Sequence, residues 1–141
     1  MISTLTSLKN DLVKRAASLK MKKYRQKEGL FLLEGKRAVE EALASRWTFR
    51  ALFFTRLPEG WERRAEESAL PWYEVPLPVL QKITATEDPQ SVAALVEIRQ
   101  ENLDSFAPER GLVLVLDQIR DPGNLGTLCL LYTSPSPRDP K

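Results

Sequence analysis

Residues 29–44 read GLFLLEGKRAVEEALA, and this stretch decides the fold. Its first part is a short apolar run, Leu30 to Leu33, which predicts a strand that ends at Glu34-Gly35. Its second part, Lys36 to Ala44, predicts a helix, because four apolar residues fall on one helical face: Ala38, Val39, Ala42 and Leu43. A strand followed directly by a helix indicates an α/β unit.

The same alternation continues to residue 99. Strands are predicted at 51–55, 72–75 and 91–99, with helices at 58–70 and around Val79, Leu80 and Ile83, and with a polar turn at 84–90. Strands that alternate with helices at this spacing predict an α/β domain with a largely parallel sheet over residues 29–99.

Basic residues are concentrated at the start of the chain. Residues 1–27 hold eight Lys and Arg against the single acid Asp11, a local balance of +7 in a chain whose net charge is +2. Residues 1–28 are predicted to form a basic helical arm, because apolar residues recur at spacings of three and four: Leu5, Leu8, Leu12, Ala16 and Leu19. The pair Thr6-Ser7 is suited to capping the start of this helix, and residues 20–27 are expected to continue it as helix or loop.

Such an arm suits the phosphate backbone of a nucleic acid, and a solvated charged helix face is the alternative. The predicted RNA-contacting residues are Lys22, Lys23, Tyr24, Arg25 and Lys27. The ring of Tyr24 offers a surface on which a base could stack, or it packs under a loop.

The composition excludes several classes of chemistry. The chain has 141 residues, no histidine and one cysteine, which removes Ser-His-Asp and Cys-His catalysis and the usual zinc sites, so no metal is expected. No apolar run approaches the ~20 residues that cross a bilayer, and the N-terminus lacks a secretory apolar core. A soluble, cytoplasmic protein without a membrane partner is therefore expected.

A second domain is predicted after a polar linker at 100–110. Gly111 to Leu116 is a continuous apolar run, typical of a strand buried on both faces. Polar residues follow at the edge where open α/β sheets bind ligands: Asp117, Asp121 and Asn124. Pro122-Gly123 supplies a tight turn, Asn124 could cap the next helix, and Gly126 would permit close approach.

Taken alone, the segment from Asp117 to Gly126 is also compatible with a turn and a helix cap that bind no ligand. A phosphate-binding loop is less favoured, because the run lacks both the Gly-x-Gly-x-x-Gly spacing and a Gly-Lys-Ser/Thr ending.

Taken together, several sequence segments in the same order resemble the SpoU/TrmH family of RNA ribose 2′-O-methyltransferases. Leu116-Asp117 and the run from Asp121 to Thr127 resemble its first motif, and 22–35 with 38–43 resemble its N-terminal substrate-binding domain. Residues 84–90 and the strand after them resemble the end of that domain, although Ser91 and Ala93 depart from a glycine-containing version. The resemblance covers roughly residues 5–128.

The resemblance implies an α/β substrate-binding domain related to RNA-binding ribosomal proteins, then a trefoil-knot methyltransferase domain whose first strand and turn are 111–128. It implies methyl transfer from S-adenosylmethionine to a ribose 2′-hydroxyl of rRNA or tRNA. Asn124 matches the family's active-site asparagine, whereas Leu130 stands where its activating arginine would fall. Asp117, Asp121, Pro122 and Gly126 would support the motif.

Since the later cofactor motifs have no counterpart here, the chain is expected to be the front part of a longer enzyme. It should be inactive, bind no S-adenosylmethionine by itself and be monomeric, whereas its parent would be a homodimer. Residues 129–141, CLLYTSPSPRDPK, resemble the translation of a sequencing-library adapter and are expected to be disordered; a natural Ser/Pro-rich tail is the alternative.

Two other interpretations of the whole chain stay open. One is a standalone RNA-binding module of ribosomal-protein type. The other is a small nucleotide-binding α/β protein that uses Pro122 to Gly126 as a phosphate turn.

Overall fold

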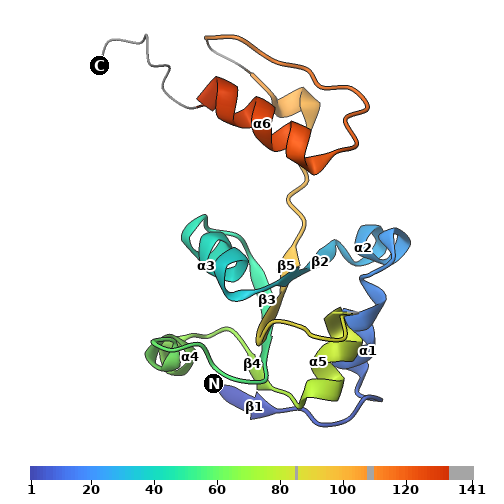
Figure 1. Cartoon of the computed structure of the whole chain (residues 1–141), viewed down its shortest axis with the longest axis vertical. Helices are drawn as coiled ribbons and strands as arrows, with labels where there is room; N and C mark the ends of the chain where they lie inside the picture. The colour runs from blue at the N-terminus through green and yellow to red at the C-terminus, as the bar shows by residue number, and fades with distance from the viewer. Residues whose placement is uncertain (85, 108–109, 134–141) are drawn as a thin grey trace. The chain divides into compact units, whose positions relative to one another are not determined.

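The chain divides into two compact units, Met1–Gln100 and Glu101–Lys141 (Figure 1). The structure, a computed structural model, describes residues 1–84, 86–107 and 110–133, the last four of them by their backbone alone. Each unit is described separately below.

The first unit is a five-stranded mixed sheet between two layers of helices (Figure 1). The strands lie in the spatial order β1-β4-β3-β5-β2, and their bounds are β1 Ile2–Thr4, β2 Leu30–Glu34, β3 Phe49–Phe54, β4 Trp72–Glu74 and β5 Val92–Glu97. β4 pairs parallel with β1 and β3, whereas β5 pairs antiparallel with β3 and β2. The predicted α/β class is confirmed.

The prediction of a largely parallel sheet is wrong for two of the four pairings. The crossover from β2 through α3 (Lys36–Ala44) to β3 leaves a gap of one strand, and β5 fills that gap in the opposite direction. Alternation of helices and strands says nothing about the direction in which the last strand enters a sheet, so the sequence pattern could not indicate this reversal.

The helices bury one apolar side each against the sheet. α1 (Asp11–Ser18) and α5 (Leu77–Thr84) cover one face, and α3 and α4 (Glu62–Glu67) cover the other (Figure 1). Along β5, Ala93 and Leu95 enter the core under α1 and α5, whereas Val92, Ala94 and Val96 enter the core under α3 and α4. This alternation of side chains between two buried faces explains why β5 is apolar throughout.

Aromatic rings fill the core under α3 and α4. Trp72 lies edge-on to Trp61, with ring centroids 6.0 Å apart, and edge-on to Phe54 at 6.5 Å. The Trp61 Nε1 donates to Glu40 Oε1 at 3.1 Å, which links α4's start to α3. The buried Trp72 Nε1 has no hydrogen-bond partner in the described part of the chain.

The N-terminal segment differs from the predicted single helix over residues 5–19. Residues 2–4 form the edge strand β1, and α1 begins only at Asp11, because the Asn10 Oδ1 accepts from the backbone N–H of Leu12 at 2.9 Å and of Val13 at 3.4 Å. Helix α2 (Lys22–Glu28) follows as a separate helix. The cap at Asn10, and not Thr6-Ser7, therefore sets the start of α1.

The second unit contains a 3₁₀ turn, η1 (Leu103–Ser105), and the helix α6 (Pro122–Thr133). The predicted strand over 111–116 is wrong: the segment has no strand structure, and Leu112 and Val115 are 79% and 83% exposed. A strand exists only through its ladder with a neighbour, and the described residues of this unit supply no second strand.

The end of the chain is also partly different from expectation. α6 extends through Thr133, so the predicted disorder is wrong for residues 129–133, where Leu-rich sequence continues the helix. Residues 134–141 lie outside the described residues. Among the residues described, no helix has the length and apolar character required to cross a membrane.

Loss of the α1 cap should destabilise the first unit. Asn10→Ala removes the acceptor for two backbone N–H groups and should lower the free energy of unfolding by roughly 1 kcal/mol, measured by urea denaturation. Asn102→Ala is the matched control, because the Asn102 Oδ1 accepts from the Asp104 N–H at 3.0 Å in the second unit. Equal destabilisation of the main unfolding transition by both variants would contradict the assignment.

Candidate nucleic-acid interface

The five residues predicted to contact RNA all lie on α2. Lys22, Lys23 and Lys27 are exposed, and Tyr24 and Arg25 are half-buried. The helix ends at Gly29, whose φ of 65° lies in the left-handed region and whose N–H bonds to the Arg25 carbonyl at 2.9 Å. Since only glycine takes this conformation without strain, Gly29 sets where α2 stops and β2 starts.

Arg25 has a structural role. Its Nη1 donates to the carbonyl oxygens of Leu19 at 2.8 Å and Lys20 at 2.7 Å. These carbonyls lie at the C-terminal end of α1, where backbone oxygens lack partners within the helix and where a positive charge is favoured. Arg25 therefore joins α2 to α1, and its charge is already used within the fold.

Tyr24 is also engaged, by its neighbour on the helix. The Lys23 Nζ lies over the Tyr24 ring, 4.8 Å from its centroid. This is a cation–π contact, and it covers one face on which a base would stack. Lys23 remains exposed and keeps its charge at the surface.

Two further lysines bind backbone oxygens. The Lys20 Nζ donates to the Lys82 carbonyl, and the Lys82 Nζ donates to the Leu8 carbonyl at 2.8 Å. Both contacts connect the N-terminal segment to α5. In contrast, four exposed lysines form no side-chain hydrogen bond or ion pair within the described ranges: Lys9, Lys14, Lys22 and Lys27. These four carry charge that an RNA backbone could neutralise.

A cleft of about 380 Å³ opens beside α1 and α2. Its floor is apolar and is formed by Leu30, Ala51 and Leu95 of the sheet, and Leu12 of α1 adds an apolar side wall. Two Arg–Glu ion pairs line its walls, one from the helices and one from the sheet: Arg15 with Glu28, and Arg50 with Glu97. These four charged residues were missed by sequence reasoning.

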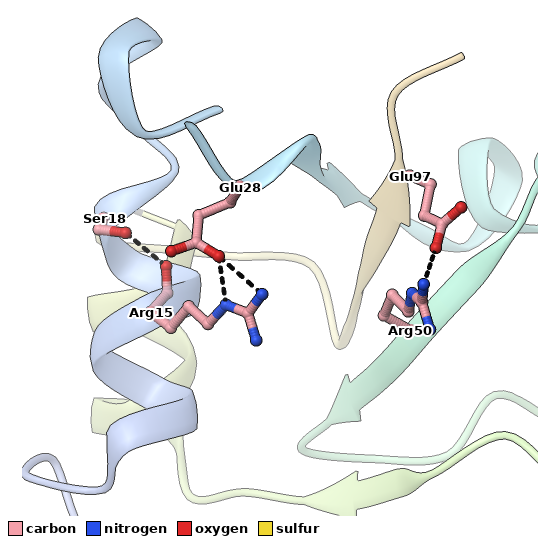
Figure 2. Close-up of polar contacts among 5 residues, drawn as sticks. All are labelled: Arg15, Ser18, Glu28, Arg50 and Glu97. Atoms are coloured by element: carbon pink, nitrogen blue, oxygen red, sulfur yellow. Dashed lines mark hydrogen bonds and ion pairs between the residues drawn. The ribbon is translucent and has the colours of Figure 1, made fainter. Parts of the chain in front are cut away.

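The first pair joins two helices. Arg15 on α1 contacts the Glu28 Oε2 with Nη2 at 2.7 Å and donates to the same oxygen from Nε at 2.9 Å. The Ser18 Oγ donates to the Arg15 carbonyl at 2.7 Å one turn later (Figure 2). Glu28 is the last residue of α2, so this pair and Arg25 both connect α2 to α1.

The second pair joins two strands. The Arg50 Nη2 contacts the Glu97 Oε1 across the β3–β5 ladder (Figure 2). The register of that ladder shifts between Phe49 and Ala51, which pair with Val96 and Leu95. The extra residue lets the consecutive side chains of Arg50 and Ala51 both line the cleft.

The motif residues of the second unit are placed differently from expectation. Asp121, and not Asn124, caps α6: its Oδ1 accepts from the Gly123 N–H at 3.0 Å, and Pro122 is the first helical residue. Asn124 lies exposed in the first turn, and Asp117 is exposed. A Cβ at Gly126 would meet no atom within 4 Å, so no close approach is seen there.

Residues 110–127 are exposed along their whole length, so this segment by itself encloses no cavity that would bury most of an adenosine-sized ligand such as S-adenosylmethionine. The backbone of Leu130 lies in α6, and its side chain lies outside the described part of the structure. Within the described ranges, no group of three or more His, Cys, Asp or Glu side chains is arranged to hold a metal ion.

Comparison with known proteins identifies the class. The family model described as the MRM3-like substrate binding domain matches residues 10–94, which span α1 through most of β5. The chain belongs to this family. The resemblance to the SpoU/TrmH family that the sequence motifs indicate is confirmed by this match and by the relatives described next.

The similar proteins described here are RNA methyltransferases. The 23S rRNA (guanosine(2553)-2'-O)-methyltransferase RlmP of Bacillus subtilis is 35% identical over 127 residues, which cover 88% of this chain and 48% of the relative. An rRNA methyltransferase from Sinorhizobium meliloti superimposes with a TM-score of 0.70 at 33% identity, covering 90% of this chain and 49% of that chain. Its AdoMet-bound counterpart gives 0.66 at 29% identity, covering 78% and 42%. The chain thus spans about half the length of these relatives.

The two kinds of cation on α2 should respond differently to substitution. Arg25→Gln removes two bonds to carbonyls at the end of α1 and should lower the free energy of unfolding by about 1 kcal/mol. Lys22→Gln, the matched control on the same helix, should change it by less than about 0.5 kcal/mol. Urea denaturation measures both, and equal effects would refute the structural assignment of Arg25.

Proposed function

We propose that this chain binds RNA and serves as the substrate-binding part of an RNA ribose 2′-O-methyltransferase. The family match over residues 10–94 carries the proposal. It is supported by the B. subtilis relative, whose name specifies 2'-O methylation of 23S rRNA. The RNA we propose as substrate is ribosomal RNA.

The phosphate contacts are assigned to α2 and its neighbourhood. Lys22, Lys23 and Lys27 are exposed on one short helix, and Lys9 and Lys14 add charge from the segment before it. Each lysine that neutralises a phosphate releases counterions, which supports affinity without reading sequence. Arg25 positions this helix against α1 and is not counted among the phosphate contacts.

Methyl transfer is proposed for the whole protein. S-adenosylmethionine would supply an activated methyl group, as the AdoMet-bound relative suggests. Asn124 is the residue of this chain that we propose for the active site of the assembled enzyme, and we propose that the enzyme pairs as a homodimer. Because residues 110–127 enclose no cavity of the size that the cofactor requires, we propose that this chain alone transfers no methyl group.

The lysines of α2 should control the salt dependence of RNA binding. Replacing Lys22, Lys23 and Lys27 by Gln should reduce the slope of log Kobs against log salt by about 2 for a short single-stranded RNA, since each contact contributes about 0.7. Fluorescence anisotropy at several salt concentrations measures the slope.

The matched control removes the same charge from α4 and from the segment between β3 and α4, by replacing Arg63, Arg64 and Arg56 with Gln. This variant should keep the slope of the unmodified chain. If the lysine variant keeps it as well, RNA does not bind along α2.

Cofactor binding provides a separate test. Titration of the chain with S-adenosylmethionine in a calorimeter should give no heat of saturable binding, because residues 110–127 enclose no site for the cofactor. A saturable signal with one site per chain would show that the cofactor binds here after all.

A further inference from the structure

We propose that the cleft beside α1 and α2 binds one unpaired guanine base of the RNA. The proposal rests on the proposed RNA-binding function and adds the element of the RNA that the domain reads. It is carried by the joint presence of an apolar floor, a hollow of about 380 Å³ and two Arg–Glu pairs at the walls.

The floor of the cleft is apolar. It is the sheet surface itself, formed where Leu30, Ala51 and Leu95 stand on three adjacent strands, and because they are at most 4% exposed, a base would contact only their outermost atoms. Leu12 of α1 adds an apolar side wall. Leu95 stands on the middle strand β5, and Ala51, its partner in the ladder, stands beside it on β3 and adds only a small side chain. A volume of about 380 Å³ lies within the range of small-molecule sites.

The walls present donors and acceptors together. The side chains of Arg15 and Arg50 are 50% and 64% exposed, and each guanidinium has more N–H donors than its ion pair uses. The side chains of Glu28 and Glu97 are less exposed, at 27% and 33%, and their carboxylates can accept from further N–H groups. A ligand that fits must therefore carry acceptors and donors along its edges.

The charge of the cleft favours a base over a phosphate. Each arginine is already neutralised by a glutamate, and a phosphate inside the cleft would face two carboxylates. Uncommitted positive charge lies next to the cleft residues in the sequence instead, at Lys14 beside Arg15 and at Lys27 beside Glu28. This division places the sugar–phosphate chain on the lysines and the neutral base in the cleft.

Guanine matches this arrangement best. Its O6 and N7 form a pair of acceptors for a guanidinium, and its N1–H and N2–H form a pair of donors for one carboxylate. Adenine, cytosine and uracil each lack at least one of these two pairs. Only a base released from a helix exposes both edges, so the ligand is a single-stranded or looped segment of RNA.

Base preference tests the proposal. The full chain is titrated with four fluorescent RNA heptamers that differ only in a central G, A, C or U between uridines. The G heptamer should bind about tenfold more tightly than the others. Glu97→Gln and, separately, Arg50→Gln should reduce this preference to within about twofold while leaving the salt dependence of binding to the U heptamer unchanged.

An equivalent ion pair outside the cleft provides the control. Arg63 and Glu67 on α4 are also joined, with Nε to Oε1 at 2.7 Å, so Glu67→Gln and Arg63→Gln should keep the preference for the G heptamer. Because Glu28→Gln changes the opposite wall, it gives a second cleft variant if either change at the sheet impairs folding, which circular dichroism would reveal.

The outcomes separate the two proposals. Salt-dependent binding with equal affinity for all four heptamers, or a G preference that survives every cleft variant, overturns the cleft assignment and leaves the RNA-binding function standing. No salt-dependent binding to any heptamer overturns the RNA-binding function itself.

Discussion

The antiparallel insertion of β5 between β2 and β3 is the constraint on which the first unit depends. Residues 92–96 are each at most 1% exposed, because they pair with a strand on both sides and contribute to the core on both faces of the sheet. Without β5, β2 and its following helix would have no ladder to the rest of the sheet. The same strand ends in Glu97, so the element that closes the core also supplies one wall of the cleft.

Sequence reasoning located most elements of residues 29–99, because apolar periodicity is a local property that these helices and strands express clearly. It failed where the outcome depended on distant partners. The direction of β5, the pairing of residues 2–4 with β4 and the absence of a strand at 111–116 are all decided by which strand is available as a neighbour. The cleft was missed for the same reason, although Arg50 within an otherwise apolar strand and Glu97 at the end of another were visible signals.

The basic N-terminal region shows why charge alone does not identify an interface. Backbone carbonyls at a helix end and phosphates of a nucleic acid attract the same side chains, through the same electrostatics. Arg25, Lys20 and Lys82 bind carbonyl oxygens within the fold, whereas Lys22 and Lys27 form no such contacts among the described residues. From composition the two groups are indistinguishable, and only the hydrogen bonds separate them.

The three tryptophans of the domain all lie on the same side of its sheet. Trp47, Trp61 and Trp72 all pack into the core under α3 and α4, and the cleft is lined by no tryptophan. The indole N–H of Trp72 is buried in apolar surroundings, an environment that shifts emission toward the blue. Tryptophan fluorescence therefore reports whether the core under α3 and α4 is intact. It should respond little to a ligand in the cleft on the opposite face of the sheet, so unfolding and ligand binding can be followed by separate signals.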